Sequence, residues 1–386
     1  MKKQLTRIAS WMLLATMGQA GAFAQNIRID MNQTYPEKTI SLQKVADVKY
    51  IPLETTDEVL FNGIVTNLSA EGIAGFNKKE GDILVFDGTG KAIASFNHTG
   101  QGPNEYNKIY HLDVDWKQKE VYVQDNFRQK IRIYGLDGSH LRTIDLQETM
   151  QQGDLYSFSD TRLIYYAQPK SKPVTAYEPV TLLSKKDASK VTLPFTKTDD
   201  NLVKATGGPF GDMKMSAKNV NLLCKKGDEV YVNEVTADVI YRVESNHALT
   251  PVVERTPSYQ DASGQDFFLM LTGANARYYF FKRQQALLEF QGNAATDTKS
   301  TYVAYDRKEK QLLNPTFTNE DYPSQDIPMS KLLQCAGSAN RCYLQLEAFK
   351  LKEALAEGKL KGTLKSIAEK LDEEDNPVLM VVEFKK

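Results

Sequence analysis

The sequence predicts an all-β fold, a six-bladed β-propeller with a short helical insertion near the C-terminus, and three observations lead to this prediction. The chain of 386 residues contains 19 Tyr and 17 Phe, which are residue types that favour strands. An apolar pattern with turn signals recurs at a spacing of 48 residues, within the range of propeller blades. Its apolar segments are short and alternate with a period of two, which is typical of strands rather than helices.

The clearest repeat lies between residues 82 and 146. A short apolar segment, a Gly-containing turn and a second apolar segment occur twice in the same order. This agreement predicts two neighbouring blades of the same construction. Four positions match in one register: Phe86 with Tyr134, Gly90 with Gly138, Ile93 with Leu141, and Phe96 with Ile144.

A second echo extends the repeat further along the chain. Residues 121–123, Val-Tyr-Val, and Ile131 return 109 residues later as Val-Tyr-Val at 230–232 and Ile240, an interval that fits two slightly longer blades. A lone four-stranded sheet would expose an apolar face, whereas radial packing of several sheets buries both faces. About six blades of roughly 50 residues fit the chain once a leader and a helical insertion are set aside.

The first 24 residues predict a secretory signal peptide. A positively charged start precedes a mostly apolar stretch at residues 8–22, and Ala22-Phe23-Ala24 places small residues before a cut near Ala24. The first Cys is Cys224, so we do not expect a lipoprotein, and no later apolar run is long enough for a transmembrane helix. We therefore expect a periplasmic or extracellular protein.

The charge balance argues against two classes of partner. The whole chain has 48 Lys and Arg against 49 Asp and Glu, a net charge of −1. Removal of residues 1–24 lowers the positive count to 45 and leaves the processed chain at −4. No overall positive field remains to hold nucleic acid or an anionic membrane.

Residues 25–386 predict a single propeller domain whose two ends are strands. Residues 38–53 alternate as a strand pair, and residues 378–384 form the densest β-branched run of the chain. We expect the two ends to share one blade and to close the ring by noncovalent pairing.

Residues 344–373 predict an amphipathic helical insertion. Gly358 and Gly362 are expected to divide it into two short helices. The insertion is either a decoration packed on the last blade or a dock for a partner. Its apolar positions recur at mostly three- to five-residue spacing: Phe349, Leu355, Leu360, Leu364, Ile367 and Leu371.

The three cysteines leave one pairing open. Cys335 and Cys342 lie seven positions apart, and the Gly and Asn between them would let the chain turn back to form a disulfide in an oxidising compartment. The alternative is that these two thiols stay unbridged. Cys224 is expected to be a small buried apolar residue.

A Gly-rich turn followed by three short strands covers residues 96–138. The turn is Gly-Gln-Gly-Pro-Asn-Glu-Tyr at 100–106, and the strands carry Val-Asp at 114–115, Gln-Asp at 124–125 and an Ile-centred segment that leads to Asp-Gly at 137–138. This order resembles an NHL-type propeller repeat. Asn104 and Lys130 depart from that pattern, since they stand where such repeats usually have Gly and Arg.

The wider chain carries a second resemblance. Tyr-Ile-Pro-Leu-Glu-Thr at 50–55 and Asp-Asn-Pro-Val-Leu at 375–379 resemble segments of the exported six-bladed β-propeller proteins of Bacteroidetes. The resemblance covers nearly all of residues 25–386. It implies the architecture but no particular activity.

Oxygen-rich side chains at strand ends suggest calcium at the propeller axis. Calcium prefers six to eight oxygen ligands, so several side chains would have to converge. The simpler interpretation is that Asp and Asn end strands because they bond the backbone of turns. Zinc bound through histidines is a further alternative. The sequence offers Asp113, Asp115, Asp125, Asn126, Asn233 and Glu234 for calcium and His98, His111, His140 and His247 for zinc; we assign no ligand and keep Asp125, Asn126, Asn233, Glu234 and His111 as the metal candidates.

The aromatic run at residues 278–281 allows two interpretations. Its Tyr-Tyr-Phe-Phe sequence would offer stacking surfaces for sugar rings if one face were exposed. A core strand explains the same residues without a ligand.

No catalytic motif is present: the chain lacks a nucleophile elbow, a phosphate loop and a dinucleotide fingerprint. We therefore expect a monomeric envelope propeller, without a cofactor, that binds an envelope protein or a small ligand such as a glycan or peptide through its loop face. The alternative is a calcium- or zinc-dependent hydrolase or lyase with the metal at the axis. A third hypothesis is a structural subunit of an outer-membrane assembly that docks through the helical segment around Gly358.

Overall fold

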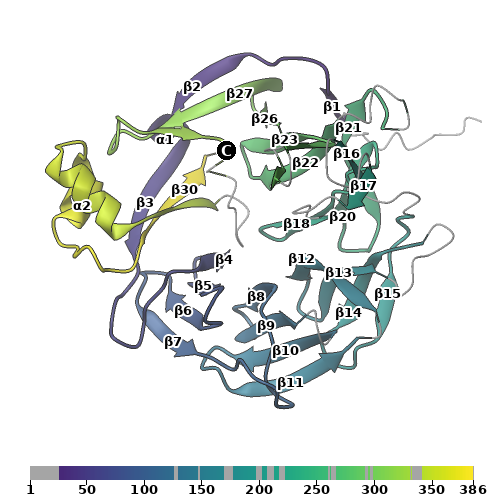
Figure 1. Ribbon diagram of the computed structural model, residues 1–386, viewed down its shortest axis with the longest axis horizontal. Coiled ribbons are helices and arrows are strands. Elements are labelled where there is room, and N and C mark those ends of the chain that lie inside the picture. Colours follow the sequence, from purple (N-terminus) through teal and green to yellow (C-terminus); the bar gives the residue numbers. More distant parts are fainter. Residues whose placement is uncertain are drawn as a thin grey trace, which may run out of the picture.

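Six small β-sheets stand in a ring around a central axis and form the blades of a β-propeller, which confirms the predicted fold class (Figure 1). Among the residues that the structure describes, no helix is long and apolar enough to cross a membrane. The predicted signal peptide, Asn126 and Cys335 lie outside the described residues. The computed structural model describes residues 26–125, 129–146, 148–168, 177–196, 202–206, 213–216, 222–259, 261, 267–291, 294–295, 299–330, 332 and 341–385.

Three consecutive four-stranded antiparallel sheets, blades A to C, form one half of the ring, with their strands in chain order from the axis outward (Figure 1). Blade A contains β4 (Ile64–Leu68), β5 (Gly72–Phe76), β6 (Ile83–Asp87) and β7 (Ala92–Phe96). Blade B contains β8 (His111–Asp115), β9 (Glu120–Asp125), β10 (Lys130–Gly135) and β11 (His140–Asp145). Blade C contains β12 (Thr149–Ser157), β13 (Arg162–Gln168), β14 (Val180–Ser184) and β15 (Lys190–Thr192).

Blades D to F form the other half, and the N-terminal segment adds an outer strand to each. Blade D contains β18 (Leu223–Lys226), β19 (Glu229–Val232), β20 (Val239–Val243), β21 (Leu249–Thr256) and β1 (Ile27–Asp30). Blade E contains β22 (Phe267–Ala274), β23 (Tyr278–Gln285), β26 (Ser300–Asp306), β27 (Gln311–Thr318) and β2 (Glu37–Ser41), with β28 (Asp326–Pro328) beside β27. The described strands of blade F are β29 (Arg341–Leu346), β30 (Val378–Phe384) and β3 (Ala46–Pro52), which the short helix α1 (Leu42–Val45) precedes.

An additional small sheet lies apart from the six blades. It joins two segments that are distant in the sequence, because β16 pairs in parallel with β24. The sequence did not predict this sheet. Its strands are β16 (Leu202–Thr206), β17 (Met213–Ser216), β24 (Leu287–Gln291) and β25 (Ala294–Ala295).

The sequence repeat corresponds to the blades. Phe86 and Tyr134 occupy the third strands of blades A and B, and both are buried. Gly90 and Gly138, in the turns that follow, have φ of +92° and +84°, a conformation that glycine adopts without strain. The 109-residue echo joins β9 to β19, the second strands of blades B and D, so the two-blade interval is also confirmed.

The two ends of the chain meet in blade F, as predicted. β3 pairs with β30 in antiparallel register from Ala46 opposite Phe384 to Pro52 opposite Val378. The prediction that residues 38–53 form a strand pair was wrong, since β2 and β3 belong to different blades. β2 instead pairs in parallel with β27 of blade E, and β1 pairs in parallel with β21 of blade D.

The ring has two unlike faces. The inner strands β4, β8, β12 and β18 all end on one face, where connections of two to four residues lead to the next strand. We call this side the turn face. The opposite side, the loop face, carries the longer connection at residues 97–110 and the helical insertion.

The helical insertion consists of two short helices, as expected, but it begins later than predicted. Residues 344–346 belong to β29, and the helices are α2 (Ala348–Ala356) and α3 (Gly362–Ala368). Leu351 and Leu364 are buried in the core cluster that blades E and F share, whereas Phe349 is 45% exposed and was wrongly assigned to the apolar stripe. Gly358, with φ of +68°, follows the end of α2.

The aromatic run at residues 278–281 is a core strand. All four rings are buried in β23, the second strand of blade E, because this blade packs against a neighbour on each face. The interpretation as a sugar-stacking surface was therefore wrong. Cys224 is buried in β18 as expected, and Cys342 is buried in β29. The bridge between Cys342 and Cys335 stays a prediction, because Cys335 lies outside the described residues.

Candidate functional site

A cavity of about 470 Å³ opens at the turn-face end of the axis. Its lining comes from the turns that follow β4, β8, β12 and β18 and from Arg341 and Glu383 of blade F. Five of the six blades therefore contribute to it. We call this cavity the axial mouth.

Asp113 of β8 is buried and does not itself line the axial mouth, but it bonds three residues that do. This carboxylate accepts hydrogen bonds from Asn67 Nδ2 at 2.7 Å, from the Ser157 amide at 2.6 Å and from Lys225 Nζ at 3.0 Å. Burial would raise the pKa of Asp113, but the charge of Lys225 and the Ser157 amide outweigh burial and hold the pKa below its usual value. Asp113 thus joins blades A, B, C and D through one negative charge.

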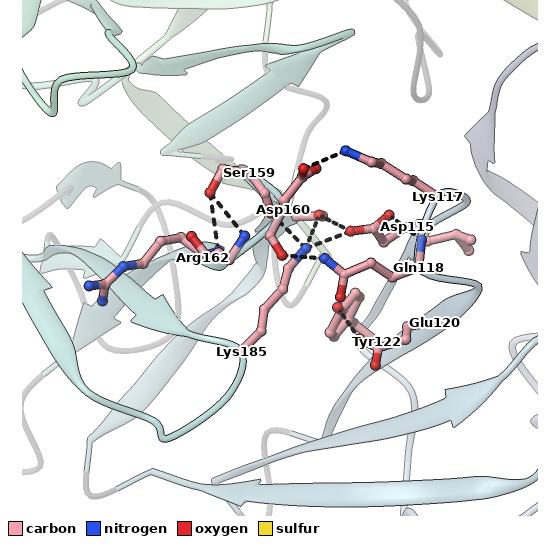
Figure 2. A network of polar contacts seen from close by, with 12 residues as sticks. Asp115, Lys117, Gln118, Glu120, Tyr122, Ser159, Asp160, Arg162 and Lys185 are labelled. Carbon is pink, nitrogen blue, oxygen red and sulfur yellow. Dashed lines mark hydrogen bonds and ion pairs between the residues drawn. The ribbon is translucent and has the colours of Figure 1, made fainter.

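A second buried ion pair lies between blades B and C (Figure 2). Lys185 Nζ donates to Asp115 Oδ2 at 2.6 Å, to Ser157 Oγ at 2.9 Å and to the Ser159 carbonyl at 2.7 Å. Burial opposes the charge of Asp115, yet hydrogen bonding from Lys185 and the Gln118 amide keeps the pKa of Asp115 below its usual value. All three protons of the Lys185 ammonium are engaged, so this pair is complete without a ligand.

The rim of the axial mouth carries two further ion pairs. Lys117 Nζ bonds Asp160, and Gln118 Nε2 donates to the Asp160 carbonyl (Figure 2). On the blade F side, Arg341 Nε lies 3.3 Å from Glu383 Oε2. The Lys117–Asp160 pair is exposed and contributes little stability because water screens it, whereas Arg341 and Glu383 are partly buried.

Trp116 forms an aromatic wall of the axial mouth and is fixed at two edges. Its Nε1 donates to Asn67 Oδ1 at 2.8 Å. Its benzo edge lies so close to Gly72 that a Cβ there would approach Trp116 Cη2 to 2.4 Å. Glycine at position 72 therefore makes room for the indole. Trp116 is partly buried against the core that blades A and B share, and it lines the cavity.

His111 lies at the other end of β8, beside the axial polar residues. Its ring meets the Tyr156 ring edge-on at 5.0 Å, and among the described residues its buried Nε2 has no hydrogen-bond partner. Burial lowers the pKa of His111 to about 4; Asp113 opposes this shift and Lys225 reinforces it. The imidazole is therefore neutral at pH 7.

This depressed pKa predicts a loss of stability in mild acid. Between pH 6.5 and about 4, His111 is protonated in the unfolded chain but not in the folded protein. The free energy of unfolding therefore decreases as the pH is lowered through this range. We expect His111 to account for about 2 to 3 kcal/mol of the difference in unfolding free energy between pH 7 and pH 4.5. Urea denaturation of wild type and His111→Gln at pH 7 and at pH 4.5 measures this difference in unfolding free energy. Equal pH dependence in the two proteins would contradict the assignment.

The structure does not bring the metal candidates together. Asp125 accepts the Asn107 amide at 3.1 Å, Asn233 accepts the Leu271 amide at 3.0 Å, and Glu234 accepts the Tyr166 hydroxyl at 2.7 Å. Each of these three side chains ties strands and connections inside the ring. The described residues contain no group of three or more His, Cys, Asp or Glu side chains placed to hold a metal ion.

The remaining zinc candidates serve local packing. His98 stacks on Tyr134 at 5.0 Å and lies 2.8 Å from the Gly138 carbonyl through Nε2, and His140 packs edge-on against the same Tyr134. His247 packs near Phe158. His98 and His140 therefore share the Tyr134 ring, whereas His247 packs beside a residue of blade C.

The sequence pointed to Asp113 and Asp115 as axial carboxylates but not to their partners. Asp115 lines the axial mouth and pairs with Lys185, which follows β14. Asp113 is buried and pairs with Lys225 of β18, which lines the cavity. Lys225, Lys185, Trp116 and Asn67 were missed. Their signal was slight: each sits at or beside the end of a strand, where polar residues are expected in any case.

Comparisons with known proteins extend this picture. A family model described as "Domain of unknown function (DUF4934)" matches residues 26–383. The chain belongs to the DUF4934 family. The comparison with curated proteins gives no match.

Two solved structures from Bacteroides resemble this DUF4934 member. A protein described as exported, from Bacteroides fragilis NCTC 9343, is 15% identical with a TM-score of 0.62, and the match covers 93% of this chain and 99% of that chain. A member of the DUF4221 family from Bacteroides vulgatus ATCC 8482 is 10% identical with a TM-score of 0.51, and the match covers 89% of this chain and 98% of that chain. At these identities the likeness shows the fold alone.

Proposed function

We propose that this protein is a non-catalytic binding module of the bacterial envelope and that it holds its ligand in the axial mouth. The observation that carries the proposal is the cavity itself, which five blades build from convergent polar side chains and an aromatic wall. Its volume of about 470 Å³ lies in the range of small-molecule sites. The sequence favoured the loop face, but this cavity lies on the turn face.

A second cavity differs from the axial mouth in its lining, and this difference supports the axial mouth as the binding site. It has a volume of about 490 Å³ and lies on the loop face beside α2. Its lining comes from blades A and F, from the start of α2 and from the segment between β27 and β29. It therefore lacks the convergence of several blades on the axis.

The chemistry of the axial mouth favours binding over catalysis. Ser157 is the one hydroxyl there that touches a lysine, and a serine beside a lysine is a known arrangement for nucleophilic attack. Lys185, however, directs all three of its protons to acceptors and has no lone pair to take the serine proton. No observation favours the metal-dependent hydrolase or lyase.

The location and finer family relation are part of the same proposal. We infer export to the periplasm or the cell exterior after cleavage near Ala24, as a monomer without a lipid anchor. The resemblance to exported propellers and the matching fold of a Bacteroides protein described as exported support this. We also propose that residues 96–138 are an NHL-like repeat, on the residues that carry the resemblance.

A single fluorescent reporter tests the binding proposal. The chain has two Trp, Trp11 in the predicted signal peptide and Trp116 in the axial mouth, so Trp11→Phe leaves one reporter in the cavity. The probes are neutral trisaccharides, tri-lysine and tri-glutamate, added to this variant while their concentrations are followed by chromatography. We expect at least one probe to change Trp116 emission saturably without being consumed. Consumption of a bound probe, or silence of every probe, would overturn the proposal.

A further inference from the structure

We infer that the ligand of the axial mouth is a neutral saccharide, bound with a sugar ring against Trp116 and with hydroxyl groups on Lys225. This inference rests on the proposed function and names the ligand class of the same cavity. It is carried by three features: the pairing of the charges, the remaining donors of Lys225, and the fixed indole face.

The charges of the axial mouth are already compensated within the protein. A charged ligand buried in such a site would need an uncompensated counter-charge. Glu71 and Asp228 have no paired base among the described residues, but both are exposed at the rim, and Glu71 already bonds Ser69. Water screens charges at such positions, so they give a cationic ligand little affinity. The paired bases of the lining are Lys117 with Asp160, Lys225 with Asp113, and Arg341 with Glu383.

Lys225 differs from Lys185, which is also paired with a carboxylate of β8, in its hydrogen bonding. Lys185 donates three hydrogen bonds, whereas Asp113 is the one acceptor of the Lys225 ammonium among the described residues. The Lys225 side chain is 12% exposed and lines the cavity. An ammonium has three protons, so two remain for a ligand. A hydroxyl oxygen accepts such a proton without adding charge.

The carboxylates of the lining supply hydrogen-bond acceptors, whereas Lys225 supplies donors. An ionised carboxylate has about four acceptor sites, and pairing with one lysine leaves some of them open. Asp115 lines the cavity with its Oδ1 directed to the Gln118 amide and its Oδ2 to Lys185. A hydroxyl group both donates and accepts, so it suits a wall in which lysine protons and carboxylate oxygens alternate.

Trp116 gives the cavity an apolar surface of fixed orientation. The Asn67 hydrogen bond and the close contact with Gly72 hold the indole by its edges, so its face is available without a loss of side-chain freedom on binding. Phe158 adds a second aromatic side chain to the lining. The C–H face of a sugar ring covers such a surface, while its hydroxyl edge reaches the charged pairs. A charged peptide such as tri-lysine or tri-glutamate has no comparable ring face.

The experiment compares ligand classes on one protein. Calorimetric titration of the full chain uses neutral trisaccharides of glucose, galactose, mannose, xylose and N-acetylglucosamine, and tri-lysine and tri-glutamate as charged probes. We expect at least one neutral trisaccharide to bind more tightly than either charged probe. In the Trp11→Phe chain its addition should shift Trp116 emission.

Two lysine variants form a matched pair. Lys225→Met should weaken trisaccharide binding about ten-fold or more, because it removes hydrogen bonds from a charged donor. Lys117→Met removes an exposed lysine from the rim of the same cavity and should change affinity less than about three-fold. Thermal unfolding confirms that both variants are folded. Trp116→Leu should weaken binding to a similar extent as Lys225→Met.

The outcomes separate the ligand class from the site. If tri-lysine or tri-glutamate binds best and Lys225→Met alters its affinity, the saccharide inference fails and the axial mouth remains a binding site. If no neutral trisaccharide binds, the inference fails. If trisaccharides bind equally to wild type, Lys225→Met and Trp116→Leu, the site as well as the inference is wrong.

Discussion

A chain without residues 26–52 is expected to lose its closed ring and to be recovered as unfolded or aggregated protein. These residues include β3, which pairs along seven residues with β30 and completes blade F. They also bury Ile29 and Leu42 completely in the cores of blades D and F. Since six blades seal one another around the axis, an incomplete blade F exposes apolar faces on both of its neighbours. Circular dichroism and size-exclusion chromatography measure the result.

A shorter deletion is the control. Removal of residues 26–36 takes away β1, which adds to the outer edge of blade D, but leaves β2 and β3 in place. This variant should still fold as a ring, with a lower thermal midpoint because β1 buries apolar side chains. If the chain without residues 26–52 unfolded cooperatively at the wild-type midpoint, noncovalent closure through β3 would be refuted.

The parts of the fold that could be predicted are those encoded in short stretches. The spacing of Phe86 and Tyr134, each followed by a glycine of positive φ, marks two equivalent strands and turns. A period of two in residues 121–123 distinguishes strand from helix. These patterns involve only residues that are close in the sequence, so they can be recognised without knowing which strands pair.

The N-terminal strands show where sequence reasoning stops. β2 and β3 both look like strands, and adjacent strands usually pair. β2 instead joins β27, whose pairing residues lie more than 270 positions away in the chain, and it does so in parallel. An apolar strand fits any open edge, so the pattern of residues 37–52 cannot specify the blade.

The site was predicted less well because its partners are distant in the sequence. Lys225 meets Asp113 across 112 positions, and Lys185 meets Asp115 across 70. A carboxylate at a strand end has the same local sequence whether it meets a lysine, a turn amide or calcium. The sequence offered both Asp113 and Asp125 for calcium and kept only Asp125 as a metal candidate. The fold directs the first to the axis and the second to the Asn107 amide.

Asp113→Ala should lower the unfolding free energy by about 3 to 5 kcal/mol, the usual cost of breaking one side of a buried ion pair. Asp113 is 2% exposed and accepts three hydrogen bonds, from Asn67, Ser157 and Lys225. Its removal leaves the Lys225 ammonium without its hydrogen-bonded carboxylate, in a place where its side chain is 12% exposed. Urea denaturation at pH 7 measures the loss.

Two comparisons distinguish a buried charge from a general loss of contacts. Asp160→Ala breaks an ion pair at the same mouth whose side chains are 73% and 65% exposed, and it should cost about 1 kcal/mol or less. The double variant Asp113→Ala with Lys225→Met removes both buried charges and should be more stable than Asp113→Ala alone, because the uncompensated ammonium is gone. If the double variant were the less stable of the two, the cost of Asp113→Ala would arise from lost packing and hydrogen bonds. The axial mouth would then owe little of its geometry to the pairing of Asp113 with Lys225.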